Sequence, residues 1–186
     1  MSRRLAQGFD GDPDRRPREA VEAVVALGAN LGDRAETMAA AIKDLARVPL
    51  VDAVRVSEPI ESVALKPEGP DASAPAYLNA VAILTTRLAP SVLLGYLHAI
   101  EQRHGRVRSL GRSSHEPGWE DRTLDLDLIA YGDVTSDDPR MLLPHPRAAE
   151  RDFVLAPWLA VDPDAVLPGV GRVDRALRRL REAGGR

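Results

Sequence analysis

The sequence contains no cysteine, so neither disulfide bonds nor thiolate metal ligands contribute to its structure. Its net charge of -3 lacks the basic excess that marks nucleic-acid-binding domains. No apolar run reaches the roughly 20 residues that a membrane-spanning helix needs. These absences argue against a secreted disulfide scaffold, a nucleic-acid partner and a membrane partner. They fit a cytoplasmic protein.

The N-terminal segment lacks the apolar stretch of a signal peptide and is rich in Arg, Asp, Pro and Gly. We expect residues 1–19 to form a disordered extension and residues 20–186 to form one domain. With 186 residues, 44% of them hydrophobic, the chain is long enough to bury a core of its own. A monomer or a weak homodimer is expected.

Apolar periodicity predicts four strands and two intervening helices. The strands are expected at 21–27, 51–57, 77–87 and 123–131, and the helices at 34–47 and from Pro90 onward. The first strand is expected to stop at Gly28. This order predicts a ferredoxin-like α+β fold, in which helices pack on one face of an antiparallel sheet. A helical C-terminal tail is expected after it, around 153–161 and 173–181.

Two long stretches between these elements are expected to be irregular. Residues 58–76 are interrupted by several prolines, which disfavour regular structure. Residues 104–119 combine glycines with arginines. Loops of this length inside a compact domain tend to be functional or disordered.

Asp125 and Asp127 are the most informative polar residues. Because side chains alternate across a strand, both carboxylates are expected on one face, with Leu124, Leu126 and Leu128 pointing into the core. Neighbouring carboxylates repel each other unless a cation lies between them, and oxygen ligands of this kind suit Mg²⁺. The alternative is an ordinary solvent-exposed strand face, although aspartate is a poor strand former.

Arginines gather on the N-terminal side of the aspartate pair, at Arg106, Arg108, Arg112 and Arg122. Cations beside a two-carboxylate metal site are what phosphoryl transfer requires, since this chemistry depends on positioning and charge neutralisation. The alternative is a set of exposed cations near the end of a helix.

The C-terminal third adds three candidate ligands. His145 lies between two prolines, a rigid setting that either aims its ring at an anion or forms a structural turn. Arg151 and Phe153 are two residues apart, so they could contact a phosphate and a flat ring, or pack a helix. The turn at 28–32 is glycine-rich but lacks the Lys-Ser/Thr ending of a P-loop, so a tight strand-to-helix turn is expected there.

Taken in order and spacing, several segments resemble the hydroxymethyl-dihydropterin pyrophosphokinase family, from about residue 24 to about residue 167. These segments read LGANLGD, YLNAV, GRVR, RTLDLDL, LPHPR and RDFVLAPW. The resemblance implies transfer of pyrophosphate from ATP to the hydroxymethyl group of 6-hydroxymethyl-7,8-dihydropterin, releasing AMP, in folate biosynthesis. It also implies two Mg²⁺ ions.

The resemblance assigns roles to individual residues. The implied metal ligands are Asp125 and Asp127. The implied catalytic cations are Arg106, Arg122 and Arg112. ATP is expected to contact Glu101, Arg106, Arg108, Arg122, Leu128, Arg140, His145 and Arg151. The pterin is expected to contact Ser62, Tyr77, Asn79, Trp119 and Phe153.

Two other functions stay open. A different ferredoxin-like, two-metal nucleotidyl or phosphoryl transferase is disfavoured by the balanced charge and by the aromatic and amide side chains of the expected pterin pocket. A catalytically weak binding module is favoured by one departure: Glu120 and Asp121 stand where the family usually has Gly-Pro.

Overall fold

The structure is a computed structural model that describes residues 14, 16–17, 19–66, 69–71, 75–105 and 123–184. Most of the expected N-terminal extension lies outside these ranges. Five expected site residues also lie outside them: Arg106, Arg108, Arg112, Trp119 and Arg122.

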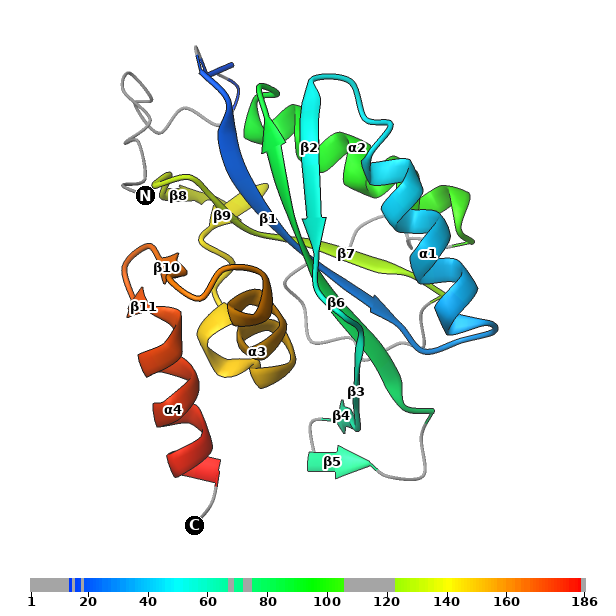
Figure 1. The fold of residues 1–186 in the computed structure, drawn as a ribbon, viewed down its shortest axis with the longest axis vertical. Coiled ribbons are helices and arrows are strands. Elements are labelled where there is room, and N and C mark those ends of the chain that lie inside the picture. Colours follow the sequence, from blue (N-terminus) through cyan, green and yellow to red (C-terminus); the bar gives the residue numbers. More distant parts are fainter. Residues whose placement is uncertain are drawn as a thin grey trace.

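The centre of the fold is an antiparallel sheet in the order β2-β6-β1-β7 (Figure 1). Its strands are β1 (Val21–Ala29), β2 (Val51–Val56), β6 (Tyr77–Thr86) and β7 (Asp125–Tyr131). Helix α1 (Arg34–Leu45) joins β1 to β2, and α2 (Pro90–Arg103) joins β6 to β7. The order strand-helix-strand-strand-helix-strand with this pairing confirms the predicted ferredoxin-like α+β fold.

Local sequence explains where α1 and α2 begin. The Asp33 side chain accepts the backbone N–H of Glu36 at 2.9 Å, so it caps the first turn of α1. Pro90 opens α2, where its fixed φ suits the first helical turn and no N–H is needed.

One face of the sheet carries the main core, beneath α1 and α2. Strand residues such as Leu27, Leu84 and Leu126 pack there against Met38 of α1 and Leu97 of α2. All five side chains are almost fully buried. Burial of apolar area on this scale is the dominant stabilising term of the fold.

The opposite face is also covered over part of its area, by the C-terminal helices α3 (Asp152–Val161) and α4 (Val173–Gly184). Val81, Ile83 and Ile129 of the sheet pack there against Trp158 of α3 and Leu177 of α4. Both helices lie on the side of the sheet away from α1 and α2 in Figure 1. The sequence predicted this helical tail but did not say where it packs.

Short strands complete the fold. Strand β3 (Ile60–Ser62) pairs with β6, and β4 (Ala64–Lys66) pairs with β5 (Gly69–Asp71). The expectation that 58–76 has no regular structure is therefore wrong. Two further hairpins and one 3-10 turn follow: β8 (Ser136–Asp138) with β9 (Met141–Leu143), β10 (Val166–Leu167) with β11 (Gly171–Arg172), and Ala148–Glu150. Across the described ranges, no helix is long and apolar enough to span a bilayer.

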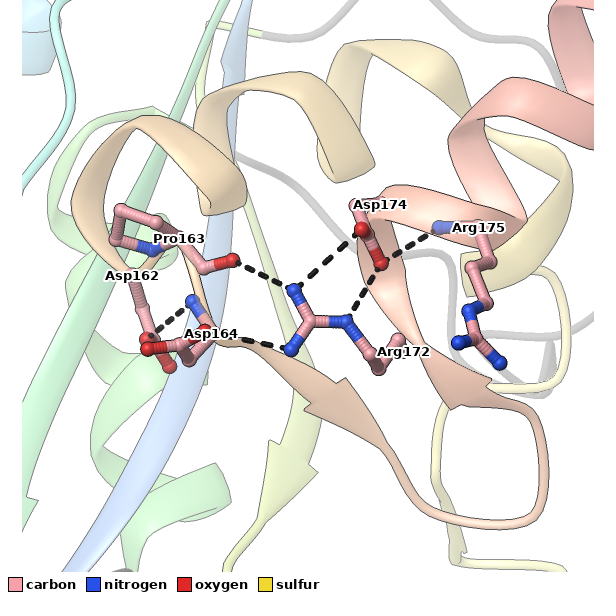
Figure 2. Close-up of polar contacts among 6 residues, drawn as sticks. All are labelled: Asp162, Pro163, Asp164, Arg172, Asp174 and Arg175. Atoms are coloured by element: carbon pink, nitrogen blue, oxygen red, sulfur yellow. Dashed lines mark hydrogen bonds and ion pairs between the residues drawn. The ribbon is translucent and has the colours of Figure 1, made fainter. Parts of the chain in front are cut away.

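Arg172 ties the β10–β11 hairpin to its neighbours (Figure 2). Its Nε and Nη2 donate to the two carboxylate oxygens of Asp174 at 2.9 and 3.4 Å, and its Nη1 donates to Asp164 at 3.3 Å. The hydrogen bond from Arg172 lowers the pKa of Asp174 below its usual value. The arginine thus links the segment after α3 to the first turn of α4.

Candidate active site

Asp125 and Asp127 stand on the sheet face that α1 and α2 do not cover. Leu124, Leu126 and Leu128, which alternate with them, are buried in the core beneath those helices. The two aspartates are partly exposed. The alternation predicted from the sequence is therefore confirmed, and the strand places both carboxylates on the same side.

Gly28 lies between the aspartates and the expected pterin-binding amide. It pairs with Asp125 of β7 on one side and with Asn79 of β6 on the other. A Cβ at this position would lie 3.6 Å from Asn79 Oδ1 and 4.0 Å from the Asp125 Cβ. The sheet therefore carries no side chain between these two groups, and this position at Gly28, beside the buried Asn79, is the open strip. The prediction that β1 stops at Gly28 is wrong, because the strand continues to Ala29.

The Asn79 amide is held in one orientation. Its Nδ2 donates to Ser62 Oγ at 2.8 Å and lies 3.5 Å from the carbonyl oxygen of Tyr77. A carbonyl oxygen only accepts hydrogen bonds, so this geometry assigns the amide nitrogen to that side. Oδ1 is then the atom nearest Gly28, as an acceptor facing the open strip.

Two side chains with N–H groups approach the Asp127 carboxylate, and one of them, Arg151, donates a hydrogen bond to it. Arg151 Nη1 donates to its Oδ2 at 3.0 Å, and His145 Nε2 lies 3.9 Å from the same oxygen. All three side chains are mostly buried. The Arg151 guanidinium carbon also lies 5.9 Å from the centroid of the Phe153 ring, within cation–π range. The sequence-predicted residues Asp127, His145, Arg151 and Phe153 therefore come together.

The backbone determines which nitrogen of His145 can donate. The backbone N–H of Arg147 donates to His145 Nδ1 at 3.2 Å, so Nδ1 acts as an acceptor. In the neutral ring the proton is then on Nε2, the nitrogen that faces Asp127. The main chain at His145 is also held against β7, because the backbone N–H of His145 donates to the carbonyl oxygen of Ile129 at 2.8 Å.

Glu101 and Leu128, both expected at the ATP site, lie away from this group. Glu101 of α2 is fully buried, and its Oε1 accepts the backbone N–H of Leu126 at 2.9 Å. Leu128 belongs to the core beneath the helices. Glu101 is thus hydrogen-bonded to the part of β7 between the two aspartates. Neither Glu101 nor Leu128 lies on the sheet face that carries Asp125 and Asp127.

Arg140 is held in the β8–β9 turn. Its guanidinium donates to both carboxylate oxygens of Asp138, the shortest contact being 2.6 Å. These side-chain hydrogen bonds, with a further one from the Arg140 backbone, lower the pKa of Asp138 to about 2. The expected ATP contact of Arg140 stays a prediction.

Comparison with known proteins identifies the family. The family model for 7,8-dihydro-6-hydroxymethylpterin-pyrophosphokinase (HPPK) matches residues 24–163. The chain belongs to the HPPK family. A 2-amino-4-hydroxy-6-hydroxymethyldihydropteridine pyrophosphokinase of Synechocystis is 39% identical over 156 residues, which are 84% of this chain and 74% of that protein. The Pseudomonas aeruginosa protein of the same name is 42% identical over 144 residues, covering 77% and 82%.

Solved structures agree on the fold of this HPPK chain. An HPPK-DHPS structure in complex with substrates superposes with a TM-score of 0.66 at 10% identity, over 89% of this chain. Wild-type HPPK-DHPS of Plasmodium falciparum gives a TM-score of 0.62 at 11% identity, over 90% of this chain. The chain spans less than half of those longer proteins, 44% and 46% of their lengths.

The donor set of this HPPK fits magnesium. The described residues contain no group of three or more His, Cys, Asp or Glu side chains that could hold a metal ion. Mg²⁺ does not require such a cluster, since it commonly takes one or two carboxylates and completes its shell with water and substrate phosphates. Asp125 and Asp127 on one open face offer that arrangement.

Two residues near the candidate site are not among the candidates that the sequence offers. Gly28 was interpreted only as part of a turn, although an isolated glycine in a strand is a known signal for a close approach. Arg34 was interpreted only as the start of a helix. Its side chain reaches Glu61 of β3 and the carbonyl of Ala76, contacts that no local pattern reveals.

Proposed function

We propose that this chain transfers pyrophosphate from ATP to the hydroxymethyl group of 6-hydroxymethyl-7,8-dihydropterin, with release of AMP, in folate biosynthesis. Membership of the HPPK family supports the reaction. The observation that carries the proposal is the row Asn79–Gly28–Asp125 across three neighbouring strands. It sets an amide acceptor and a carboxylate on opposite sides of an open strip.

The phosphate side of the site is assigned to the group around Asp127. We propose that Asp125 and Asp127 hold two Mg²⁺ ions, which when bound neutralise phosphate charge and polarise the reacting oxygens. Arg151 and His145 present N–H donors at the same place. A charged donor such as arginine suits phosphate oxygens, because its planar fork can bind two of them at once.

The pterin side of the site is assigned to Asn79 and the neighbouring aromatic residues. The Oδ1 of Asn79 is placed to accept a hydrogen bond from the polar edge of the pterin. Ser62 supports this by holding the amide nitrogen. Tyr77 and Phe153 are proposed to contact the flat ring, and stacking of this kind contributes about 1 kcal/mol beyond area burial.

The proposed chemistry is in-line displacement at phosphorus. The hydroxymethyl oxygen releases its proton to water and forms a bond to the β-phosphorus of ATP. The bond from that phosphorus to the oxygen shared with the α-phosphate breaks, and AMP leaves with that oxygen. The residues contribute by holding the two substrates in line and by placing donors near the phosphates. Arg106, Arg112 and Arg122, which lie outside the described residues, are proposed as further cations on the transferred group.

The proposal extends to partners and location. We propose ATP and the pterin as small-molecule partners, and a monomer or weak homodimer. Supporting this, the exposed large apolar residues of the described chain are scattered over β3 and the residue after it, α2 and the β10–β11 hairpin. A cytoplasmic location is proposed because the co-substrate is ATP.

The test is AMP release from ATP with Mg²⁺, with and without hydroxymethyl-dihydropterin. We expect pterin-dependent AMP from the wild type and a loss of at least about 100-fold in Asp127→Asn, because mutating even the residues that only support a metal ligand typically costs about 10- to 100-fold. Asp137→Asn on the neighbouring hairpin is the matched control, because Asp137 is an exposed strand aspartate. Its activity should be unchanged.

Other outcomes would favour other functions. Pterin binding without any AMP release would support a binding module. AMP release that does not depend on the pterin would support a different nucleotide-using transferase. Unfolding of Asp127→Asn, seen as loss of the thermal transition, would mean that Asp127 is structural.

A further inference from the structure

Arg34 connects three segments that are distant in the sequence. It is the first residue of α1, and its Nη1 donates to the carbonyl oxygen of Ala76 at 2.7 Å. Its Nη2 donates to the Glu61 carboxylate at 2.9 Å. The Ala76 contact is partly buried, whereas the Glu61 side chain is 64% exposed.

The two acceptors lie next to residues of the proposed pterin pocket. Ala76 directly precedes Tyr77, and Glu61 directly precedes Ser62. In the pairing of β3 with β6, Ser62 lies opposite Tyr77. Since the guanidinium is planar and rigid, two bonds from separate nitrogens fix β3 and the start of β6 relative to each other and to α1.

The orientation of the Asn79 amide depends on both of these strands. Its Nδ2 donates to Ser62 Oγ of β3, and its position is set by its own strand, β6. Strand β3 is short, with three residues, and such a short edge strand has few bonds of its own to hold it. A shift of β3 away from β6 would therefore release the amide.

We propose that Arg34 is a positioning residue for pterin recognition. It clamps β3 against β6, so that Ser62 holds Asn79 with its oxygen toward the open strip beside Gly28. This inference rests on the proposed function, because it assigns a supporting role in the same site.

The stability of the fold should depend little on Arg34. Ion pairs between exposed side chains contribute little to the free energy of unfolding, and the Arg34 side chain is itself 32% exposed. The effect of losing the clamp is local, on the placement of Ser62 and the amide. A change in pterin affinity without a matching change in stability is therefore the signature of this role.

The experiment compares Arg34→Gln, Arg34→Lys and a matched control, Arg55→Gln. Arg55 has the same contact pattern elsewhere, with Nη2 on the Glu22 carboxylate at 2.6 Å and Nη1 on the Val161 carbonyl at 3.2 Å. Steady-state kinetics give KM for each substrate, and binding of the pterin is measured with a non-hydrolysable ATP analogue and Mg²⁺. Thermal unfolding is measured in parallel.

We expect Arg34→Gln to raise the pterin KM and Kd about tenfold, as for loss of a charge-assisted hydrogen bond, with the ATP KM changed less than about twofold. Arg34→Lys, which can keep one of the two contacts, should fall between wild type and Arg34→Gln. Arg55→Gln should bind the pterin like the wild type.

Equal effects of Arg34→Gln and Arg55→Gln on pterin binding would overturn the inference, as would an unchanged pterin KM in Arg34→Gln. A larger rise in the ATP KM than in the pterin KM would also overturn it. Failure of the proposed function is recognised separately, because the wild type would then release no pterin-dependent AMP.

Discussion

Gly28 provides the sharpest test of the proposed site, because adding one methyl group there should raise the stability of the fold and lower the activity. The substitution Gly28→Ala adds a Cβ 3.6 Å from Asn79 Oδ1 and 4.0 Å from the Asp125 Cβ. Both distances are ordinary van der Waals contacts. The strand backbone at Gly28 has no positive φ that only glycine would favour. The fold should therefore accept alanine without a shift.

The two expected effects of Gly28→Ala have opposite signs. Replacing a strand glycine by alanine at a compatible backbone conformation raises the free energy of unfolding by about 0.4–1 kcal/mol. An extra methylene in a closely packed core costs about 1–3 kcal/mol, and we expect a similar cost in binding where the substrate packs against Gly28. Against the pterin this corresponds to a loss of roughly 5- to 150-fold in kcat/KM.

The assay pairs thermal unfolding with pterin-dependent AMP release, and Gly95→Ala is the control. Gly95 lies in α2, where an added Cβ would meet nothing within 4 Å. That variant should gain stability by about 1 kcal/mol, the difference in helix propensity, and keep full activity. A raised Tm with unchanged kcat/KM in Gly28→Ala would refute the idea that substrate lies over Gly28. A lowered Tm would refute the packing argument.

Two further predictions concern charged contacts. Arg151→Gln removes a cation 3.0 Å from Asp127 Oδ2 and should tighten nucleotide-free Mg²⁺ binding about fivefold, the effect of roughly 1 kcal/mol of repulsion. Weaker Mg²⁺ binding, measured by calorimetry, would show instead that Arg151 orients the carboxylate. At Asp44, burial would raise the pKa, but hydrogen bonds from His104 and Arg103 together with their charges lower it below 3.8. A carboxylate whose pKa is lower in the folded state than in the unfolded state stabilises the fold when it is ionised. The contribution of Asp44 to the free energy of unfolding is therefore fully present above pH 3.8 and is lost as the pH falls through the folded-state pKa. In urea unfolding, the difference between wild type and Asp44→Asn should be about 1 kcal/mol at pH 7 and should shrink as the pH falls through the folded-state pKa of Asp44. A difference that stays constant with pH would contradict this account.

The regular part of the fold was predictable because each element carries its own periodic signal. The strand predicted at 77–87 is observed as Tyr77–Thr86, and the helix predicted at 34–47 ends at Leu45. The cap at Asp33 joins two residues that are only three positions apart in the sequence, so it was predictable as well. Local signals of this kind are sufficient for elements whose faces are clearly amphipathic.

The parts that sequence reasoning missed depend on contacts between distant residues. Strand β3 forms by pairing with β6, and its own residues have no long alternating pattern. The nearly continuous apolar run of β6 is typical of a strand buried on both faces, and it was the available signal that the tail helices cover the second face. Arg34 and Ala76 are 42 residues apart, so no local pattern predicts their contact.

The candidate site was predictable where chemistry and strand geometry coincide. Alternation alone placed Asp125 and Asp127 on one face. It could not show that Arg151 and His145 converge on Asp127, because those residues follow a separate hairpin and approach β7 only through tertiary packing. It also could not show that Gly28 separates Asn79 from Asp125, since that relation needs the register of three strands.

Strand β7 shows why stability and activity can be separated in this protein. Leu124, Leu126 and Leu128 point into the core beneath α1 and α2, so their loss would unfold the domain. Asp125 and Asp127, one residue away in each case, face the other side and contribute no apolar burial to that core. The backbone between them is fixed by the buried Glu101 carboxylate, which accepts the Leu126 N–H. The core face therefore holds the strand rigid while the opposite face can carry two repelling carboxylates, and substitutions of those carboxylates should change catalysis without unfolding the domain.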